Sequence, residues 1–291
     1  MAKDLKTLLR KHNFVFKKAY GQNFLTENEL LFEIADAANI GSEDSVIEIG
    51  CGAGALTEVL SARAAKVIGY EIDVKLKPVL KEALEGRNNA EIVFSDVMKE
   101  KMSDIEKKAG DKYLLVANLP YYITTPIVMR FLEEAKNLKR MVVTVQEEVA
   151  ERFCARAGTS EYGAATVAID LRGSAEIVKR IPREKFTPVP NVDSAVVRID
   201  IQKDKFLNAD LDAVRDIVRC GFSSRRKTLV NNIMNFYKTD RKTAESVLEK
   251  AGIPLNARGE TLVAEQYVAL SEILDVNSRN VQRNKYMKRK Q

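Results

Sequence analysis

The sequence is poor in the residues that most often bind metals or act as nucleophiles: its 291 residues include one histidine and three cysteines. With His12 as the only imidazole, we expect neither a Ser-His-Asp triad nor a histidine-rich metal site. The cysteines Cys51, Cys154 and Cys220 are scattered without CxxC spacing, which argues against a zinc site or a disulfide framework. We therefore expect reduced thiols, no metal, and a solvated His12 in a flexible arm.

The sequence also lacks long apolar runs. None of its hydrophobic stretches approaches the roughly 18 uninterrupted apolar residues of a membrane span. The segment Met1-Ala-Lys-Asp-Leu-Lys6 lacks the apolar core of a secretory signal. With 45% hydrophobic residues, the chain can nevertheless bury a substantial core. These features predict a cytoplasmic protein with no membrane partner.

Positive charge is concentrated at the two ends of the chain. The net charge is +6 and the pI is near 9.0. Lysine and arginine dominate a basic N-terminal arm, residues 1–24, and a basic C-terminal tail, residues 277–291, which contains no acid. Such ends suit contacts with a phosphate backbone, and the alternative is that they only solubilise the chain.

Apolar strand-like runs alternate with amphipathic helical stretches between residues 25 and 204. This alternation predicts an α/β domain with a mostly parallel, doubly wound sheet and helices on both faces. Strand signals vanish beyond it, and residues 205–276 are typical of a small all-α domain of three to five helices. The predicted strands are Ser45–Ile49, Lys66–Glu71, Glu91–Ser95, Tyr113–Ala117, Met141–Gln146, Val167–Leu171 and Ala195–Ile201. The predicted C-terminal helices are Leu211–Cys220, Arg226–Phe236, Thr243–Ala251 and Ala264–Leu274.

A glycine-rich turn follows the first predicted strand and indicates a nucleotide-like ligand. Gly50, Gly52 and Gly54 permit tight turning and a close approach of the backbone to that ligand. Glu71 ends the next strand about 20 residues further on, where an acid commonly binds a ribose diol. Asp96 follows the third strand and could accept from an adenine amine, although a helix N-cap is its simpler role. The turn alone fits nicotinamide enzymes equally well.

The most informative segment is Asn118-Leu119-Pro120-Tyr121, at the carboxyl end of a predicted strand. Open α/β sheets bind their ligands at this edge. An amide oxygen can accept from an exocyclic amine and a tyrosine can stack on a base, which suits the N6 amine of adenine and indicates methyl transfer. S-adenosylmethionine fits this set better than a nicotinamide because it needs no phosphate cradle, and His12 is badly placed to handle a proton.

Five motifs together resemble the ribosomal RNA adenine dimethyltransferases. They occur in the family's order and cover roughly residues 15–270. The similarity is greatest to the bacterial KsgA-type branch, which dimethylates two adjacent adenines near the 3′ end of small-subunit rRNA. The related macrolide-resistance methylases act on one adenine of large-subunit rRNA and share the early motifs. The five motifs are Lys18–Leu25, Glu48–Thr57, Asn118–Tyr121, Phe186–Ser194 and Phe222–Leu229.

The resemblance implies a Rossmann-like catalytic domain in residues 25–204 that uses S-adenosylmethionine, and a helical RNA- or ribosome-binding domain in residues 205–276. It implies that Tyr121 and Phe186 sandwich the target adenine. Asn118 and a backbone carbonyl at Pro120 would accept from its N6 amine. The implied partner is 16S rRNA within the assembling 30S subunit, and we expect a monomer. The implied cofactor-binding residues are Asn23, Leu25, Gly50, Glu71, Asp96 and Asn118, and the implied RNA-binding residues are Arg225, Arg226 and Lys227.

Two residues depart from the family pattern. Cys51 stands where proline is common; we expect it to be tolerated because proline there only restricts φ, and nothing evident would activate the thiol. Tyr122 stands where asparagine is frequent, which affects only details of the base pocket. A different class stays open: a ribosome-assembly or transcription-associated factor that keeps the fold without catalysis. The intact segment Asn118–Tyr121 argues against that class.

Overall fold

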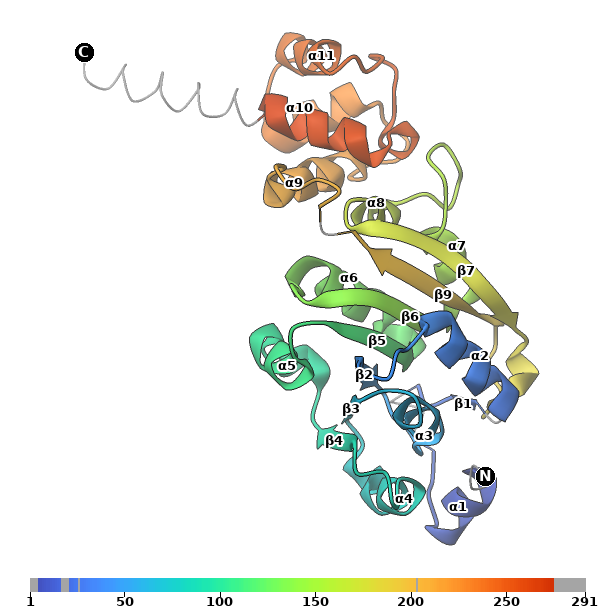
Figure 1. Cartoon of the computed structure of the whole chain (residues 1–291). Helices are drawn as coiled ribbons and strands as arrows, with labels where there is room; N and C mark the ends of the chain where they lie inside the picture. Colours follow the sequence, from blue (N-terminus) through green and yellow to red (C-terminus); the bar gives the residue numbers. More distant parts are fainter. Residues whose placement is uncertain (1–4, 17–20, 26, 203, 275–291) are drawn as a thin grey trace. The chain divides into compact units, whose positions relative to one another are not determined.

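A seven-stranded sheet with the order β4-β3-β2-β5-β6-β9-β7 dominates the computed structural model (Figure 1). The strands β4, β3, β2, β5 and β6 are parallel, and β9 and β7 continue the sheet in antiparallel pairing. The structure describes all residues except 1–4, 17–20, 26, 203 and 275–291. The strands of the sheet are β2 (Ser45–Ile49), β3 (Lys66–Glu71), β4 (Ala90–Phe94), β5 (Tyr113–Asn118), β6 (Leu138–Gln146), β7 (Gly173–Ile181) and β9 (Ser194–Ile201).

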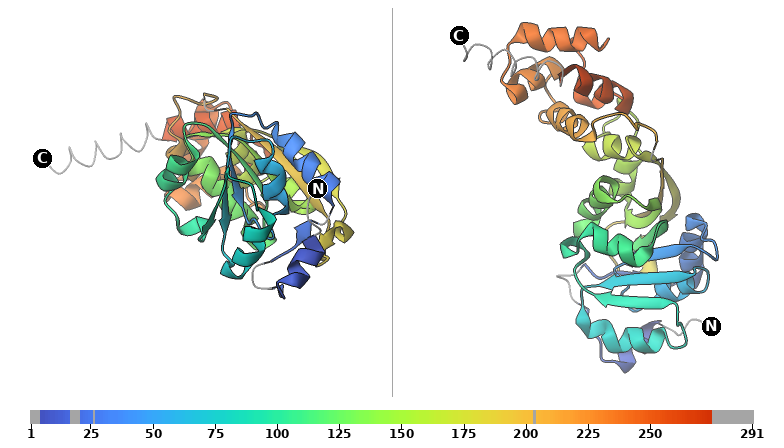
Figure 2. Two further views of the ribbon diagram at one scale, coloured as in Figure 1. Left: turned by 60° about the horizontal axis from the view of Figure 1, so that its bottom comes forward. Right: turned by 60° about the vertical axis from the view of Figure 1, so that its left-hand side comes forward.

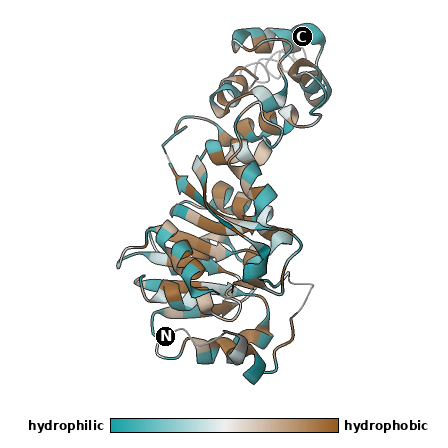
Figure 3. Ribbon diagram, turned by 90° about the vertical axis from the view of Figure 1, so that its right-hand side faces the viewer, coloured by the Kyte–Doolittle hydropathy of each residue, from teal (hydrophilic) through white to brown (hydrophobic). Residues whose placement is uncertain are grey.

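Helices cover both faces of this sheet because most of its strands are apolar on both sides. One face packs against α2 and α3, with Ile34 and Leu60 contacting the cluster that contains Val46 and Val116. Figure 1 shows α5 and α6 on the opposite side, and Figure 3 shows hydrophobic residues along the strands between these layers. The helices are α1 (Leu5–Lys11), α2 (Asn28–Ala38), α3 (Ala55–Ser61), α4 (Lys77–Ala83), α5 (Met102–Ala109), α6 (Thr124–Glu134) and α7 (Glu147–Phe153).

A second, two-stranded ribbon ties the start of the chain to a distant loop. Strand β1 (Phe24–Leu25) pairs antiparallel with β8 (Phe186–Thr187). Helix α1 precedes this ribbon in the chain and packs on α4. At the C-terminal end of α1, Lys11 and His12 both bind Glu82 of α4. The Lys11 Nζ to Oε1 distance is 2.7 Å, and the His12 Nε2 to Oε2 distance is 2.9 Å. The prediction of a solvated His12 is therefore wrong, because its ring takes part in docking this arm on α4.

The chain forms two compact units, of which the first holds the sheet and comprises residues up to Glu151 together with Gly173–Gln202. The second unit is helical and comprises Arg152–Arg172 and the chain from Lys203 onward. Its core contains Tyr162 and Tyr267, whose hydroxyls donate to the carbonyls of Leu262 and Gly259, both at 2.8 Å. Its helices are α8 (Ala164–Asp170), α9 (Leu211–Gly221), α10 (Leu229–Tyr237), α11 (Arg241–Lys250) and residues 264–274; those from α9 onward are orange to red in Figure 2.

The structure confirms the mostly parallel sheet, the helices on both faces and the helical C-terminal part, and it corrects two elements. The predicted strand Val167–Leu171 lies in α8, where Leu171 N bonds to Val167 O at 2.9 Å and both side chains enter the helical core. The edge strand β7 escaped prediction because exposed polar residues interrupt its apolar ones, so it contains no continuous apolar run. Residues 152–172 thus belong with the helices, so they interrupt the expected 25–204 domain.

The described helices include none that is long and apolar enough to cross a bilayer. Within the same part of the chain, no group of three or more histidine, cysteine or acidic side chains is arranged to hold a metal ion. The predicted basic tail, residues 277–291, lies outside the described residues, as do Lys3, Lys17 and Lys18 of the predicted arm.

Candidate functional site

The glycine turn between β2 and α3 forms one wall of a cavity at the carboxyl ends of the parallel strands. Gly50 and Gly52 have φ of 77° and 55°, in the left-handed region that glycine adopts without strain. A Cβ on Gly52 would lie 2.8 Å from the ring of Phe24, so β1 can approach the turn this closely only because Gly52 has no side chain. Gly50 N bonds to Tyr70 O at 2.8 Å, which fixes the turn against β3.

Glu71 closes β3 with its carboxylate held by two backbone donors. Gly52 N donates to Oε2 at 2.9 Å and Asp73 N donates to Oε1 at 2.8 Å. The side chain is almost fully buried, and this burial raises the pKa of Glu71, while the two backbone hydrogen bonds oppose the rise. Each carboxylate oxygen retains a further lone pair, so the group could also accept from a ribose diol.

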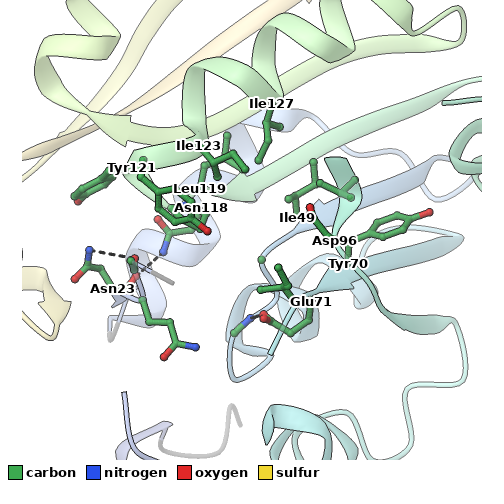
Figure 4. A pocket seen from close by; sticks show the side chains of 18 of the residues that line it. Asn23, Ile49, Tyr70, Glu71, Asp96, Asn118, Leu119, Tyr121, Ile123 and Ile127 are labelled. Atoms are coloured by element: carbon green, nitrogen blue, oxygen red, sulfur yellow. Dashed lines mark hydrogen bonds between the residues drawn. The ribbon is translucent and has the colours of Figure 1, made fainter. Parts of the chain in front are cut away.

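Asp96 follows β4 and lines the same cavity. Its Oδ1 accepts from Met98 N at 3.0 Å, so it caps a short 3₁₀ turn, Val97–Lys99. The helix-cap role and the ligand-facing position therefore coexist in this residue. Figure 4 shows Glu71 and Asp96 on neighbouring strand ends, beside Ile49 and Tyr70.

Asn118 ends β5, and its amide is oriented by the N-terminal arm. The Asn118 Nδ2 donates to Asn23 O at 2.9 Å, a bond between residues 95 positions apart. Because the nitrogen is engaged there, the amide oxygen is the group that can accept from a ligand in the cavity. Asn23 itself lines this cavity (Figure 4). Leu25, by contrast, is buried in β1 and lines a smaller cavity beside the glycine turn.

The structure corrects the carbonyl that sequence reasoning placed at Pro120. Pro120 O already accepts from Ile123 N and from the Thr124 hydroxyl, both at 3.1 Å. A carbonyl oxygen has two lone pairs, so these bonds use its capacity. The preceding carbonyl, that of Leu119, belongs to a residue that lines the cavity and is the better acceptor for an amine. Pro120 instead shapes the turn that follows β5.

The two aromatic residues expected to sandwich a base are in different environments. Tyr121 lines the cavity, is half-buried, and its hydroxyl lies 2.6 Å from Ser194 Oγ. Phe186 is only 1% exposed; it pairs with Leu25 in the ribbon and packs in the core beside Val196. Phe186 is thus not among the residues that line the cavity in this conformation, and the sandwich of a base between Tyr121 and Phe186 stays a prediction.

The cavity has a volume of about 240 Å³, and its lining suits a nucleoside that carries no phosphate groups. Two carboxylates, Glu71 and Asp96, provide acceptors for a diol and an amine, and Ile49, Val97 and Ile127 provide apolar surface for a flat base. Among the described residues that line it there is no lysine or arginine. A pyrophosphate would lack a counter-charge here, so the residues fit S-adenosylmethionine better than a dinucleotide.

Glu48 is a buried acid that was not identified from the sequence. Its position within the apolar run Val-Ile-Glu-Ile could have indicated this burial. Its side chain is 1% exposed and lines the small cavity beside the glycine turn. Neither Glu48 Oε2 nor the buried Thr57 Oγ1 has a hydrogen-bond partner. Burial raises the pKa of Glu48 to about 8, and the nearby Glu71 carboxylate adds to this rise.

Cys51 lies in the glycine turn, and its thiol is in an environment that makes it unreactive. Its side chain is buried, its Sγ lies 3.7 Å from Tyr70 O, and burial raises the pKa of the thiol well above its ordinary value. A thiol that stays protonated is a poor nucleophile, which agrees with the expectation that nothing activates it.

The basic triplet of the helical unit lies on an exposed turn before α10. It was expected to open a helix, but α10 begins only at Leu229. Arg225, Arg226 and Lys227 are all exposed, and the Arg225 guanidinium donates to Ser160 O at 2.7 Å. Arg225 therefore also fixes the loop 156–163, which leaves Arg226 and Lys227 as the better candidates for phosphate contacts.

This fold and its strand-edge acceptors define the class of S-adenosylmethionine-dependent methyltransferases that act on an exocyclic amine. Residues 13–275 match the model of the ribosomal RNA adenine dimethylase family, and the chain belongs to that family. It is 42% identical over 277 residues to "Ribosomal RNA small subunit methyltransferase A" of Bacillus thuringiensis and of Bacillus mycoides. Each alignment covers 92% of this chain and 94% of the relative.

Solved structures agree with this assignment. A dimethyladenosine transferase from Plasmodium falciparum has a TM-score of 0.75 and 29% identity, covering 88% of this chain and 98% of its own. The 23S rRNA methyltransferase ErmE has a TM-score of 0.67 and 30% identity, covering 87% and 100%. The protein is thus an rRNA adenine dimethyltransferase, and its cofactor is S-adenosylmethionine.

The buried Glu48 generates a testable pH dependence. Its folded-state pKa of about 8 lies above the ordinary 4.5, so between these values the native state retains a proton that the unfolded state has lost. The free energy of unfolding therefore falls as pH rises through this window, by up to about 1.4 kcal/mol per pH unit. Glu48→Gln should remove this loss, and the variant should gain stability relative to the wild type as pH rises from about 5 to about 8.

Urea unfolding at several pH values in that window, without cofactor, measures the effect. Glu43→Gln is the matched control because Glu43 is exposed. A stability difference between Glu48→Gln and wild type that stays constant with pH would contradict a protonated Glu48 in the native state.

Proposed function

We propose that the protein dimethylates the N6 amines of two adjacent adenines near the 3′ end of 16S rRNA, within the assembling small subunit. The observation that carries the proposal is the Asn118 amide, which is anchored by its nitrogen and directs its oxygen to the edge of the cofactor cavity. The Bacillus relatives are small-subunit methyltransferases by name, which supports that target over the large subunit. We further propose that the protein meets this substrate in the cytoplasm and acts as a monomer.

The cofactor would lie along the strand ends, with its methionine part against Asn23 and Gly50 and directed toward the smaller cavity that Leu25 lines. Glu71 would hold its ribose, and Asp96 would accept from its adenine amine. Bound S-adenosylmethionine supplies an electrophilic methyl group on a sulfonium. The two carboxylates are already oriented by backbone donors, so binding requires little further ordering of the site.

The target adenine would leave its stack and lie on the ring of Tyr121. Stacking on one aromatic ring contributes on the order of 1–3 kcal/mol. The Asn118 side-chain oxygen and Leu119 O would accept the two N6 hydrogens, which fixes the amine and turns its lone pair toward the methyl group. Positioning is the main catalytic device, and the proton leaves after transfer because the alkylated nitrogen is strongly acidic.

The helical unit would bind the RNA backbone. Arg226 and Lys227 are exposed cations on one turn, and the family resemblance covers this turn. Electrostatic contacts of this kind carry no sequence information, so the target adenines would be selected by the shape of the ribonucleoprotein as well as by the base pocket.

Methyl transfer from labelled S-adenosylmethionine to under-methylated small subunits tests the proposal, with large subunits and free rRNA in parallel. Nuclease digestion and mass spectrometry should find dimethyladenosine at two adjacent positions of small-subunit rRNA. Label confined to large-subunit rRNA would assign the protein to the branch that contains ErmE. Cofactor binding without transfer to any of these substrates would favour a binding factor.

Asn118→Ala should slow methyl transfer by about 10²-fold, as the loss of one preorganised hydrogen-bonding group does in other enzymes. Affinity for S-adenosylmethionine should change far less, because Glu71 and Asp96 remain. Single-turnover rates and calorimetric cofactor binding separate the two quantities. Asn137→Ala, on the connection before β6, is the control. Full methylation by Asn118→Ala would remove Asn118 from the mechanism.

Replacing Arg226 and Lys227 together by alanine should weaken binding to small subunits and reduce the slope of log affinity against log salt by about two. The double variant Lys107→Ala/Lys139→Ala, which removes the same charge from the sheet unit, should keep the wild-type slope. Filter binding at a series of salt concentrations measures both. Equal slopes for the two double variants would show that the triplet does not contact phosphate.

A further inference from the structure

A hydrogen bond between Tyr121 and Ser194 connects the base pocket to the antiparallel side of the sheet. The two hydroxyl oxygens lie 2.6 Å apart, and either can donate. The residues are 73 positions apart: Tyr121 follows β5, and Ser194 opens β9. Tyr121 is half-buried at the cavity, whereas Ser194 is fully buried. The contact thus joins a cavity-lining ring to the interior of the sheet unit.

Ser194 occupies a rigid position. It pairs with Gln146 of β6 on one side and with Ile181 of β7 on the other. The preceding residue, Asp193, accepts from Glu147 N through its carbonyl at 3.0 Å and from Arg183 N through its carboxylate at 2.9 Å. Three strands therefore fix the backbone that carries the Ser194 hydroxyl.

Tyr121, by contrast, stands on a short 3₁₀ turn, Tyr121–Ile123, that follows Pro120. Its backbone is paired in no strand, so the direction of its ring depends on its side-chain contacts. A stacking platform must keep its plane within about 10–20° of the productive orientation. A bond at the tip of the ring, to a hydroxyl on a rigid strand, supplies that restraint. A fully buried serine hydroxyl also requires a partner, and Tyr121 provides it.

We propose that Ser194 is a positioning residue for the methylation reaction: its hydroxyl holds the Tyr121 phenol so that the ring is ready to stack on the extruded adenine. The inference rests on the proposed function, in which Tyr121 is the stacking residue. The burial of Phe186 makes this restraint more important, because the base then has an aromatic partner on one face and depends on the orientation of that ring.

Single-turnover methyl transfer to under-methylated small subunits tests the proposal through a double-mutant cycle. Ser194→Ala and Tyr121→Phe each remove one hydroxyl of the same bond, so each should slow transfer about 3- to 10-fold. The double variant should be no slower than the slower single variant, because the bond can be lost only once. Affinity for S-adenosylmethionine should stay within about twofold of the wild type, which separates loss of orientation from general damage.

Ser61→Ala is the matched control. Ser61 is a buried serine of the same unit whose hydroxyl bonds to Glu58 O at 2.9 Å in α3, remote from Tyr121 in the fold. Ser61→Ala should transfer methyl groups at the wild-type rate. Transfer by Ser194→Ala at the same rate as Ser61→Ala would overturn the proposal. Slowing in the double variant by the product of the single effects would overturn it as well.

Fluorine NMR of 3-fluorotyrosine placed at position 121 provides a readout that does not require activity. Ser194→Ala should shift and change the width of this resonance, and Ser61→Ala should leave it unchanged. If the wild type fails to methylate small subunits, the proposed function fails, and the fluorine spectra alone decide on the restraint. An identical fluorine resonance in wild type and Ser194→Ala would overturn the proposed restraint of Tyr121 by Ser194. A shifted resonance in Ser194→Ala would support that restraint.

Discussion

Parallel pairing of β4, β3, β2 and β5 is the constraint on which the rest of the site depends. Because these strands run in one direction, their carboxyl ends meet at one edge of the sheet. The turn at Gly50, the acids Glu71 and Asp96, and the amide of Asn118 come from four separate stretches of sequence and line one cavity for this reason alone. The helices on both faces keep the strands in register, and the core thereby determines where the polar groups lie.

The polar residues at this edge each perform a structural task that also orients them. Glu71 binds the glycine turn, Asp96 caps the turn that follows it, and Asn118 binds the arm at Asn23 O. Each side chain therefore has a fixed rotamer before any ligand arrives. These hydrogen bonds to the backbone preserve the geometry of a site that works by orienting its substrate rather than by acid–base chemistry.

The residues that sequence reasoning located correctly are those whose position follows from strand order. Glu71, Asp96 and Asn118 each end a recognisable apolar run, so their arrival at one edge could be predicted together with the sheet. Phe186 could not be located, since a two-residue ribbon has no periodicity and only tertiary packing decides which way its ring points. The helix at Val167 was mistaken for a strand for the same reason: a short apolar run does not reveal its period until its neighbours are known.

The ribbon between β1 and β8 has a consequence for the order in which the protein is made. Glu27 and Lys185, which flank it, form an ion pair with an N–O distance of 2.6 Å although they are 158 residues apart. Strand β1, which lies beside the cavity, is among the first segments to leave the ribosome. Its partner β8 is synthesised only after β7. A nascent chain that ends with β5 already contains Glu71, Asp96 and Asn118 but does not yet contain the strand that pairs with β1. The pairing of β1 with β8 can therefore form only after most of the chain has been translated, so this side of the cavity is completed late in synthesis.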